Sequence, residues 1–188
     1  MTERNTLVRS MHDLGLSAWF GGSLAGAVAV NGGAADLPDP TQRLGAATAG
    51  WARWAPVNAV AIGAHLLGGA AILRANRGRV AGQRGVAAQT VAKLVLTGAA
   101  LAVTAYSGVL GKKLTGVSAP VEGGTTPAEA TPPDIAHMQR QLAACQWLIP
   151  ALTGGISVLT ALAGEQQRPG QQLVGIIAKP ARWLRAVT

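Results

Sequence analysis

Charged residues are scarce in this chain: only 13% of its 188 residues are Asp, Glu, Lys or Arg. The shortage is uneven, because four stretches hold no charged residue at all: 14–30, 54–73, 94–111 and 141–164. Each is close to the ~20 residues that a helix needs to cross a bilayer, and a soluble domain rarely contains four such runs. The sequence therefore predicts an all-α protein, an integral membrane four-helix bundle.

Cysteine and aromatic side chains are also rare. Cys145 is the only cysteine, which excludes an intramolecular disulfide. Aromatic residues make up 4% of the chain, and the basic residues behind its formal charge of +8 flank the apolar runs instead of alternating with stacking rings. We therefore expect no nucleic-acid partner. Phosphate-binding loops, metal-ligand clusters and nucleophile motifs are likewise missing, so an enzyme is the less favoured class and no cofactor is expected.

Glycine and alanine take the place of leucine and phenylalanine in the apolar runs, and the chain has 25 glycines in all. Small residues let helix backbones approach closely in a membrane. Gly22 and Gly26 form one small-residue face on the first span, and Ala64 and Gly68 form another on the second. The leading functional prediction is a small accessory or scaffold subunit, which associates through such helix faces with itself or with other membrane protein subunits.

The transmembrane domain is predicted to cover residues 1–164. Residues 165–188 alternate apolar and basic side chains, which is typical of an amphipathic tail on a membrane surface. The spans are predicted at about 12–31, 54–73, 88–110 and 142–163.

Local signals predict where helices begin and break. Asp39 as an N-cap and Pro40 at the first helical position indicate a short interfacial helix that runs toward residue 53. Pro56 is expected to kink or break it before the second span continues. The short loop after the second span predicts that spans two and three are antiparallel neighbours. Pro133 is expected to start the fourth helix, after an irregular loop rich in Pro, Gly and Thr.

The basic residues indicate the orientation. If the N-terminus is cytoplasmic, they divide ten to five in favour of the cytoplasmic side, with Lys93 left out because it lies within the third span. We therefore predict a multi-pass protein of the cytoplasmic membrane, surrounded by the lipid bilayer, with both termini cytoplasmic. The alternative is that the first run is a signal peptide preceded by Arg4 and Arg9, but its 17 residues are long for one.

Four polar residues in or beside the spans are candidates for structural or functional contacts. Asn31 and Asn58 are predicted at similar depth near the outer ends of adjacent spans, where a side-chain hydrogen bond would join them. Lys93 is expected to reach toward the inner interface and to pair with Asp13 if spans one and three adjoin. The alternative for Lys93 is the charged site of a small transporter.

Imidazole is the usual axial ligand of haem held between helices, so the three histidines are weighed as ligands. At a helix rise of about 1.5 Å per residue, His12 is placed roughly 15 Å to the cytoplasmic side of the first span's centre. His65 is placed near the middle of the second span, and His137 outside the fourth. Because no two share a depth, a bis-histidine haem is disfavoured, while a site with one histidine stays open.

The spacing H-x6-W-F-G-G is formed by His12, Trp19, Phe20, Gly21 and Gly22. This run resembles the first span of small bacterial membrane proteins that include the copper resistance D family and the membrane protoporphyrinogen oxidases, which bind haem b. The resemblance implies, as the alternative function, a haem b-binding redox protein with His12 as ligand. Those oxidases carry further histidines on later spans, whereas residues 92–108 of this chain contain none. The whole chain also resembles uncharacterised four-span membrane proteins of actinobacteria, with GWARWAPVN at 50–58.

Overall fold

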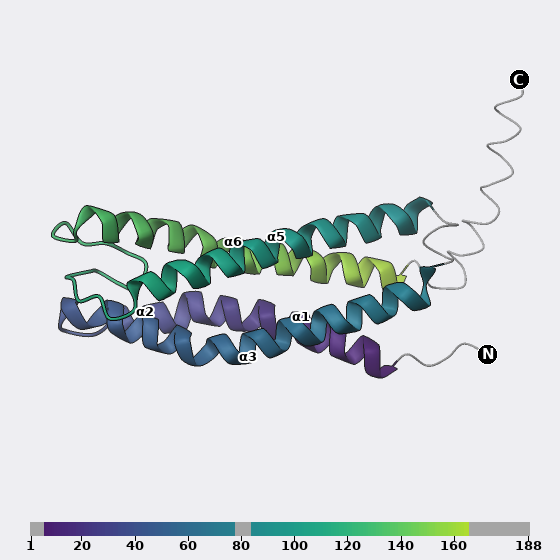
Figure 1. Ribbon diagram of the computed structural model, residues 1–188, viewed down its shortest axis with the longest axis horizontal. Coiled ribbons are helices and arrows are strands. Elements are labelled where there is room, and N and C mark those ends of the chain that lie inside the picture. Colours follow the sequence, from purple (N-terminus) through teal and green to yellow (C-terminus); the bar gives the residue numbers. More distant parts are fainter. Residues whose placement is uncertain (1–5, 78–83, 166–188) are drawn as a thin grey trace, which may run out of the picture.

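The computed structural model describes residues 6–77 and 84–165, and within them the chain is largely helical (Figure 1). The elements are, in order, α1 (Thr6–Ala25), a π-helical segment η1 (Gly26–Val30), α2 (Asn31–Ala35), α3 (Pro40–Ala75), α5 (Arg84–Leu114) and α6 (Pro133–Glu165). The first three run on as a single helix, so the described residues form four long helices. All four are long and apolar enough to cross a membrane, which confirms the predicted all-α class and the number of candidate spans.

The four long helices lie side by side, and the turn after α2 and the loop after α5 are at the same end of the bundle (Figure 1). α1 packs along both α3 and α6, and α5 packs along α6, while α3 and α5 touch little. Spans two and three, α3 and α5, run antiparallel as predicted, but they make few contacts with each other (Figure 1). α3 packs along α1 instead, because glycines on both helices let their backbones meet.

α3 begins where the sequence predicts. The Asp39 carboxylate accepts hydrogen bonds from the Thr41 hydroxyl at 2.7 Å and from the Thr41 backbone N–H at 2.9 Å, and Pro40 occupies the first turn. These hydrogen bonds, above all the one from the hydroxyl, hold the pKa of Asp39 below its ordinary value. Asp39 is therefore a charged cap that complements the positive end of the helix dipole.

α3 continues through Pro56 to Ala75, so the predicted separate interfacial helix is wrong. A proline removes one backbone donor, and Pro56 lies on an exposed side of α3. The hydrogen bonds on either side hold the rest of the helix together. Of the predicted tail, 165–188, everything after residue 165 lies outside the described residues.

Each helix is longer than its predicted span. α6 starts at Pro133, as predicted, well before the apolar run that begins at residue 141. α1 likewise begins at Thr6, ahead of the predicted boundary at residue 12. The charge-free runs mark only the apolar middle of each helix, because capping and backbone hydrogen bonds extend helices into polar sequence.

Residues 115–132 form an irregular loop that folds over one end of the bundle (Figure 1). The Val121 N–H donates to the carbonyl of Pro40 at 3.2 Å. The Arg43 guanidinium donates to the carbonyl oxygens of Leu37 at 2.8 Å and Val121 at 3.3 Å. The loop thereby ties the start of α3 to α5 and α6. Its side of the core consists of Leu44, Leu110, Leu114, Val121 and Leu142.

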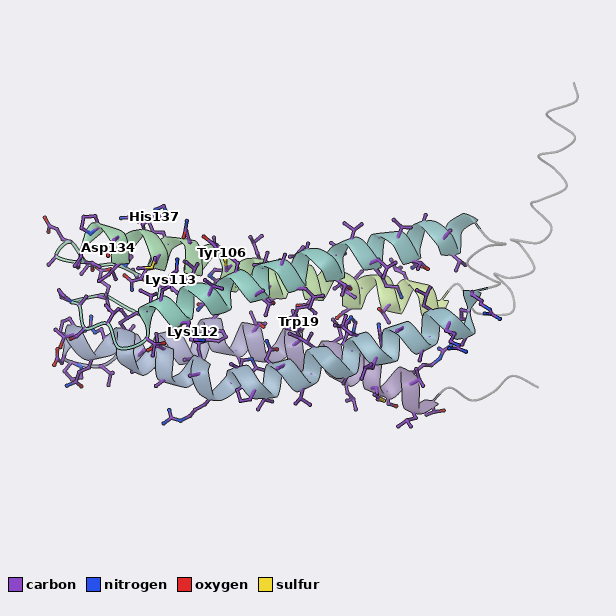
Figure 2. All side chains as sticks on the ribbon, viewed as in Figure 1. Trp19, Tyr106, Lys112, Lys113, Asp134 and His137 are labelled. Atoms are coloured by element: carbon purple, nitrogen blue, oxygen red, sulfur yellow. The ribbon has the colours of Figure 1, made fainter. Side chains whose placement is uncertain are left out.

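The middle of the bundle is apolar and centres on Trp19 of α1, which is 0% exposed (Figure 2). Its ring packs with Ala100 of α5 and Ile149 of α6. Its indole N–H donates to the Thr104 hydroxyl at 3.2 Å. α1 and α5 lie across the bundle from each other, and Trp19 is the side chain that joins them.

Candidate functional site: a buried histidine pair

Two histidines from different helices lie in ring contact inside the bundle. The ring centroids of His12 on α1 and His65 on α3 are 4.3 Å apart and the planes are tilted by 39°. The two residues, which we call the histidine pair, are 8% and 3% exposed. The prediction that they lie at different depths is therefore wrong. α3 begins well before the predicted second span, directly after the turn at 36–39. His12 precedes this turn by nearly as many residues as His65 follows it. This equal spacing is the sequence signal that would have placed the two histidines together.

Glycines on the facing helix make room for each histidine. A Cβ on Gly68 would lie 2.6 Å from the backbone nitrogen of His12, and a Cβ on Gly15 would lie 2.6 Å from that of His65. Atoms this close must move, so any side chain at either position forces the helices apart. The backbones of α1 and α3 are thus in direct contact at the histidine pair. The predicted packing role of Gly68 is seen here, within the chain.

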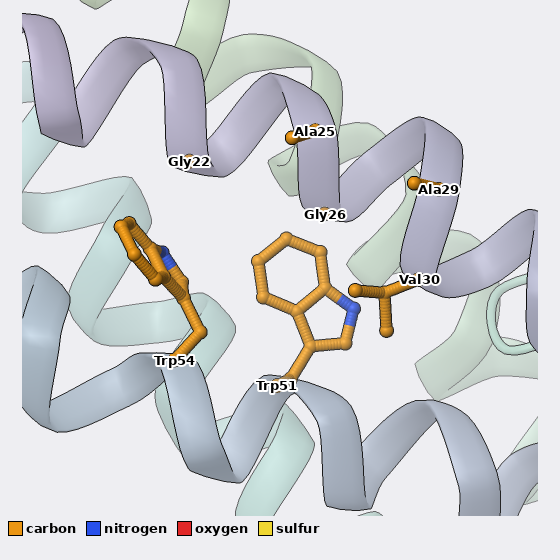
Figure 3. Close-up of a pocket in the computed structure, with 7 residues that line it drawn as sticks. All are labelled: Gly22, Ala25, Gly26, Ala29, Val30, Trp51 and Trp54. Carbon is orange, nitrogen blue, oxygen red and sulfur yellow. The ribbon is translucent and has the colours of Figure 1, made fainter.

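Gly22 and Gly26 also face α3, where the indole rings of Trp54 and Trp51 point toward them (Figure 3). A Cβ on either glycine would collide with a ring, so these positions pack inside the chain as well. Ala64, which was predicted to share a face with Gly68, is half-buried. Beside the two rings is a cavity of about 240 Å³ with an apolar lining. It is lined by Gly22, Ala25, Gly26, Ala29, Val30, Trp51 and Trp54.

Hydrogen bonds fix the orientation of both rings in the histidine pair. His12 Nδ1 is 2.7 Å from Oδ1 of Asp13, and His65 Nδ1 is 3.1 Å from the carbonyl oxygen of His12. A carbonyl oxygen only accepts, as does an ionised carboxylate, so each Nδ1 carries the hydrogen and donates. A neutral ring then has its free lone pair on Nε2. Neither Nε2 has a hydrogen-bond partner among residues 6–77 and 84–165.

Asp13 and Lys93 lie beside the histidine pair without pairing with each other. The Asp13 side chain is 58% exposed and contacts His12. Lys93 on α5 is half-buried, close enough for its charge to act on Asp13 and His65. The predicted ion pair between Lys93 and Asp13 is wrong, because α1 and α5 lie across the bundle and no charged partner lies within 4.0 Å of Lys93 in the described part of the chain.

Asn31 joins three helices near the other end of the bundle. Its Nδ2 donates to Oε1 of Gln146 on α6, and its Oδ1 accepts from Nε1 of Trp51 on α3 at 3.1 Å. The predicted hydrogen bond to Asn58 is wrong, because Asn58 lies roughly 10 Å further along α3 than Trp51. Asn58 Oδ1 is buried without a partner among the described residues. Sequence reasoning missed Gln146, whose signal was an amide in the middle of an apolar run.

The resemblance that implies haem b can be tested against the surroundings of His12. An axial ligand needs open space in front of Nε2 for the porphyrin and its iron. Here one face of the ring is against His65, and a Cβ on Gly69 would lie 3.3 Å from Cδ2 and 3.8 Å from Nε2 of His12. These contacts of His12 give no support to the haem that the resemblance implies, so we derive no chemistry through one.

The described residues contain no group of three or more His, Cys, Asp or Glu side chains placed to hold a metal ion. No protein-family model, curated protein or solved structure matches the chain.

Proposed function

We propose that this chain is an integral protein of the cytoplasmic membrane, crosses the bilayer four times and has both termini in the cytoplasm. The length and apolar character of all four helices support this. Large apolar side chains point outward along every helix, among them Leu14, Val60, Val95 and Val158. The ends of α3 and α6 lie at the same end of the bundle as the starts of α1 and α5, which agrees with the ten-to-five division of basic residues (Figure 1).

Cysteine labelling of whole cells tests the proposed orientation. The background is Cys145→Ala, which removes the native buried thiol. A cysteine at Thr115, exposed on the loop after α5, is expected to react with a membrane-impermeant thiol reagent. A cysteine at Ala75, exposed at the end of α3, is expected to react only after the cells are opened. The reverse pattern would overturn the orientation, and equal labelling of both sites in intact cells would overturn the four-span topology.

We further infer that the protein is a non-enzymatic accessory or scaffold subunit. The observation that carries this proposal is the outward face of α5. Of the four helices, α5 buries the smallest share of its apolar segment inside the chain. Gly98 and Ala102 are exposed on it, and a Cβ on Gly98 would meet no atom of the described residues within 4 Å. Because Gly22, Gly26 and Gly68 are already in contact within the chain, we assign association with a second membrane subunit to this face of α5.

Purification from the native membrane in a mild detergent tests the scaffold proposal. The unmodified chain is expected to elute in a complex larger than its own 19.0 kDa. Gly98→Leu with Ala102→Leu is expected to release it from that complex, because the larger side chains keep a partner helix from approaching. The matched control is Ala59→Leu with Gly63→Leu, which has the same spacing on α3, where a Cβ on Gly63 also meets nothing within 4 Å.

Two outcomes would contradict the scaffold proposal. A monomer from native membranes, or equal loss of the complex in both double variants, would remove the role of α5. A haem absorption band in the purified protein that disappears in His12→Ala would instead establish the redox alternative. A complex that survives in the control and is lost in the α5 variant supports the proposal.

A further inference from the structure

We propose that the histidine pair is a binding site for one proton, held between α1 and α3 and opposed by the charge of Lys93 on α5. This inference is independent of the scaffold role, because it rests on the interior of the bundle and not on its outer surface. The site consists of His12, His65, Asp13 and Lys93.

The hydrogen bonds leave one place for a proton on each ring. Both Nδ1 atoms already donate, one to the Asp13 carboxylate and the other to the backbone carbonyl of His12. An added proton must therefore bind at an Nε2 atom. With ring centroids 4.3 Å apart, the charge of a first proton opposes a second on the other ring. The pair thus takes up its first proton as a unit rather than as two separate groups.

Charged groups reach this site from two of the four helices. α1 supplies the Asp13 carboxylate, which favours a cation on His12. Burial of the His65 ring disfavours a cation most strongly, and the Lys93 ammonium of α5 disfavours it further. α3 contributes only His65 itself. α6 faces this part of α5 with residues 153–162, as the hydrogen bond from Gln89 to the Leu159 carbonyl shows. These residues include no titratable group.

The apolar middle of the bundle closes the site on one side. Trp19 meets the His65 ring edge-on with centroids 6.2 Å apart, and it packs with Ala100 and Ile149 beyond. The proton is therefore exchanged on the other side, at the end of the bundle where α1 begins. The exposed Asp13 carboxylate lies on this side of the pair. The site binds a proton without conducting it across the bundle.

Proton binding is coupled to the position of α5. A cation on the histidine pair repels Lys93. α1 and α3 are in direct backbone contact at their glycines, so they stay together. α3 and α5 touch little, so the seam between them is the part of the bundle that is free to widen. The bound proton therefore favours a larger distance between Lys93 and the histidine pair.

Nitrogen-15 NMR of the histidine-labelled full chain in nanodiscs, titrated between about pH 4 and about pH 9, tests the proposal. His12 and His65 are expected to change together at Nε2 in one shared step that adds a single proton to the pair. His137 is the internal control, because it is exposed on α6 and its one hydrogen-bond partner among residues 6–77 and 84–165 is Gln141. Since the unmodified chain carries this measurement, the result does not depend on the folding of a variant.

Three variants test the charges around the pair. Lys93→Gln is expected to move the shared step to higher pH, because an opposing charge is removed. Asp13→Asn is expected to move it to lower pH. Lys112→Gln is the matched control, an exposed lysine at the far end of α5, and is expected to leave the step in place (Figure 2).

The proposal would be overturned by either of two results with the unmodified chain. One is that His12 and His65 each take a full proton in separate, independent steps. The other is that neither takes a proton between about pH 4 and about pH 9. A shared step that stays in place in Lys93→Gln would overturn the coupling to α5.

Discussion

Gly15→Ala is expected to destabilise the protein strongly, although alanine is the better helix former. A Cβ at residue 15 would lie 2.6 Å from the backbone nitrogen of His65 and against the carbonyl oxygen of Ala61. Both are backbone atoms of α3, so no side chain can rotate away, and the two helices must separate. We expect a loss of about 3 kcal/mol in the free energy of unfolding, or a melting temperature lower by on the order of 6–12 °C.

Gly21→Ala on the same helix is the matched control. A Cβ at residue 21 would meet nothing within 4 Å, so the added methyl group only reduces backbone freedom in the unfolded chain. This variant is expected to be more stable than the unmodified protein by up to about 1 kcal/mol. Thermal unfolding in detergent, followed by the helical circular dichroism signal, measures both. Equal effects of the two substitutions would show that α1 and α3 do not touch at Gly15.

Trp19→Ala is expected to have the largest effect of any single truncation. The indole is completely buried among α1, α5 and α6, and it is the contact through which α1 and α5 meet. Its removal leaves a cavity that the helices cannot fill, and it leaves the Thr104 hydroxyl without its donor. The expected cost is about 3–5 kcal/mol in the free energy of unfolding. Titration with a denaturing detergent, read by circular dichroism, provides the measurement.

Two further variants separate the contributions of the Trp19 ring. Trp19→Phe keeps most of the ring and loses the hydrogen bond, so we expect a smaller cost of about 1–2 kcal/mol. Trp147→Ala removes the same side chain from a position that is 57% exposed, and its effect is expected to stay within about 1 kcal/mol. If Trp147→Ala proved as costly as Trp19→Ala, the core would not centre on Trp19.

The charge-free runs, the Asp39 cap and the proline at position 133 determined the class of fold and the starts of two helices, α3 and α6, from sequence alone. Each of these signals is local, since length, capping and the lack of charge act within one helix. The sequence also indicated that glycine would serve for close packing, and Gly22, Gly26 and Gly68 do pack closely. The same local logic was wrong at Pro56, where hydrogen bonds in the rest of a long helix outweighed the loss of one donor.

Only the tertiary structure decided which residues meet. Helices that are apolar on most of their surface give no periodic signal for the face that turns inward, so the sequence left open how each helix is rotated and shifted. Asn31 was predicted to bond to Asn58. It bonds instead to Trp51, which lies about two helical turns from Asn58 along α3. The same register brings His65 against His12, because Gly15 and Gly68 let the two backbones touch at that level. The partner of each polar group was therefore fixed by backbone contact between helices, which depends on the whole bundle rather than on any one segment.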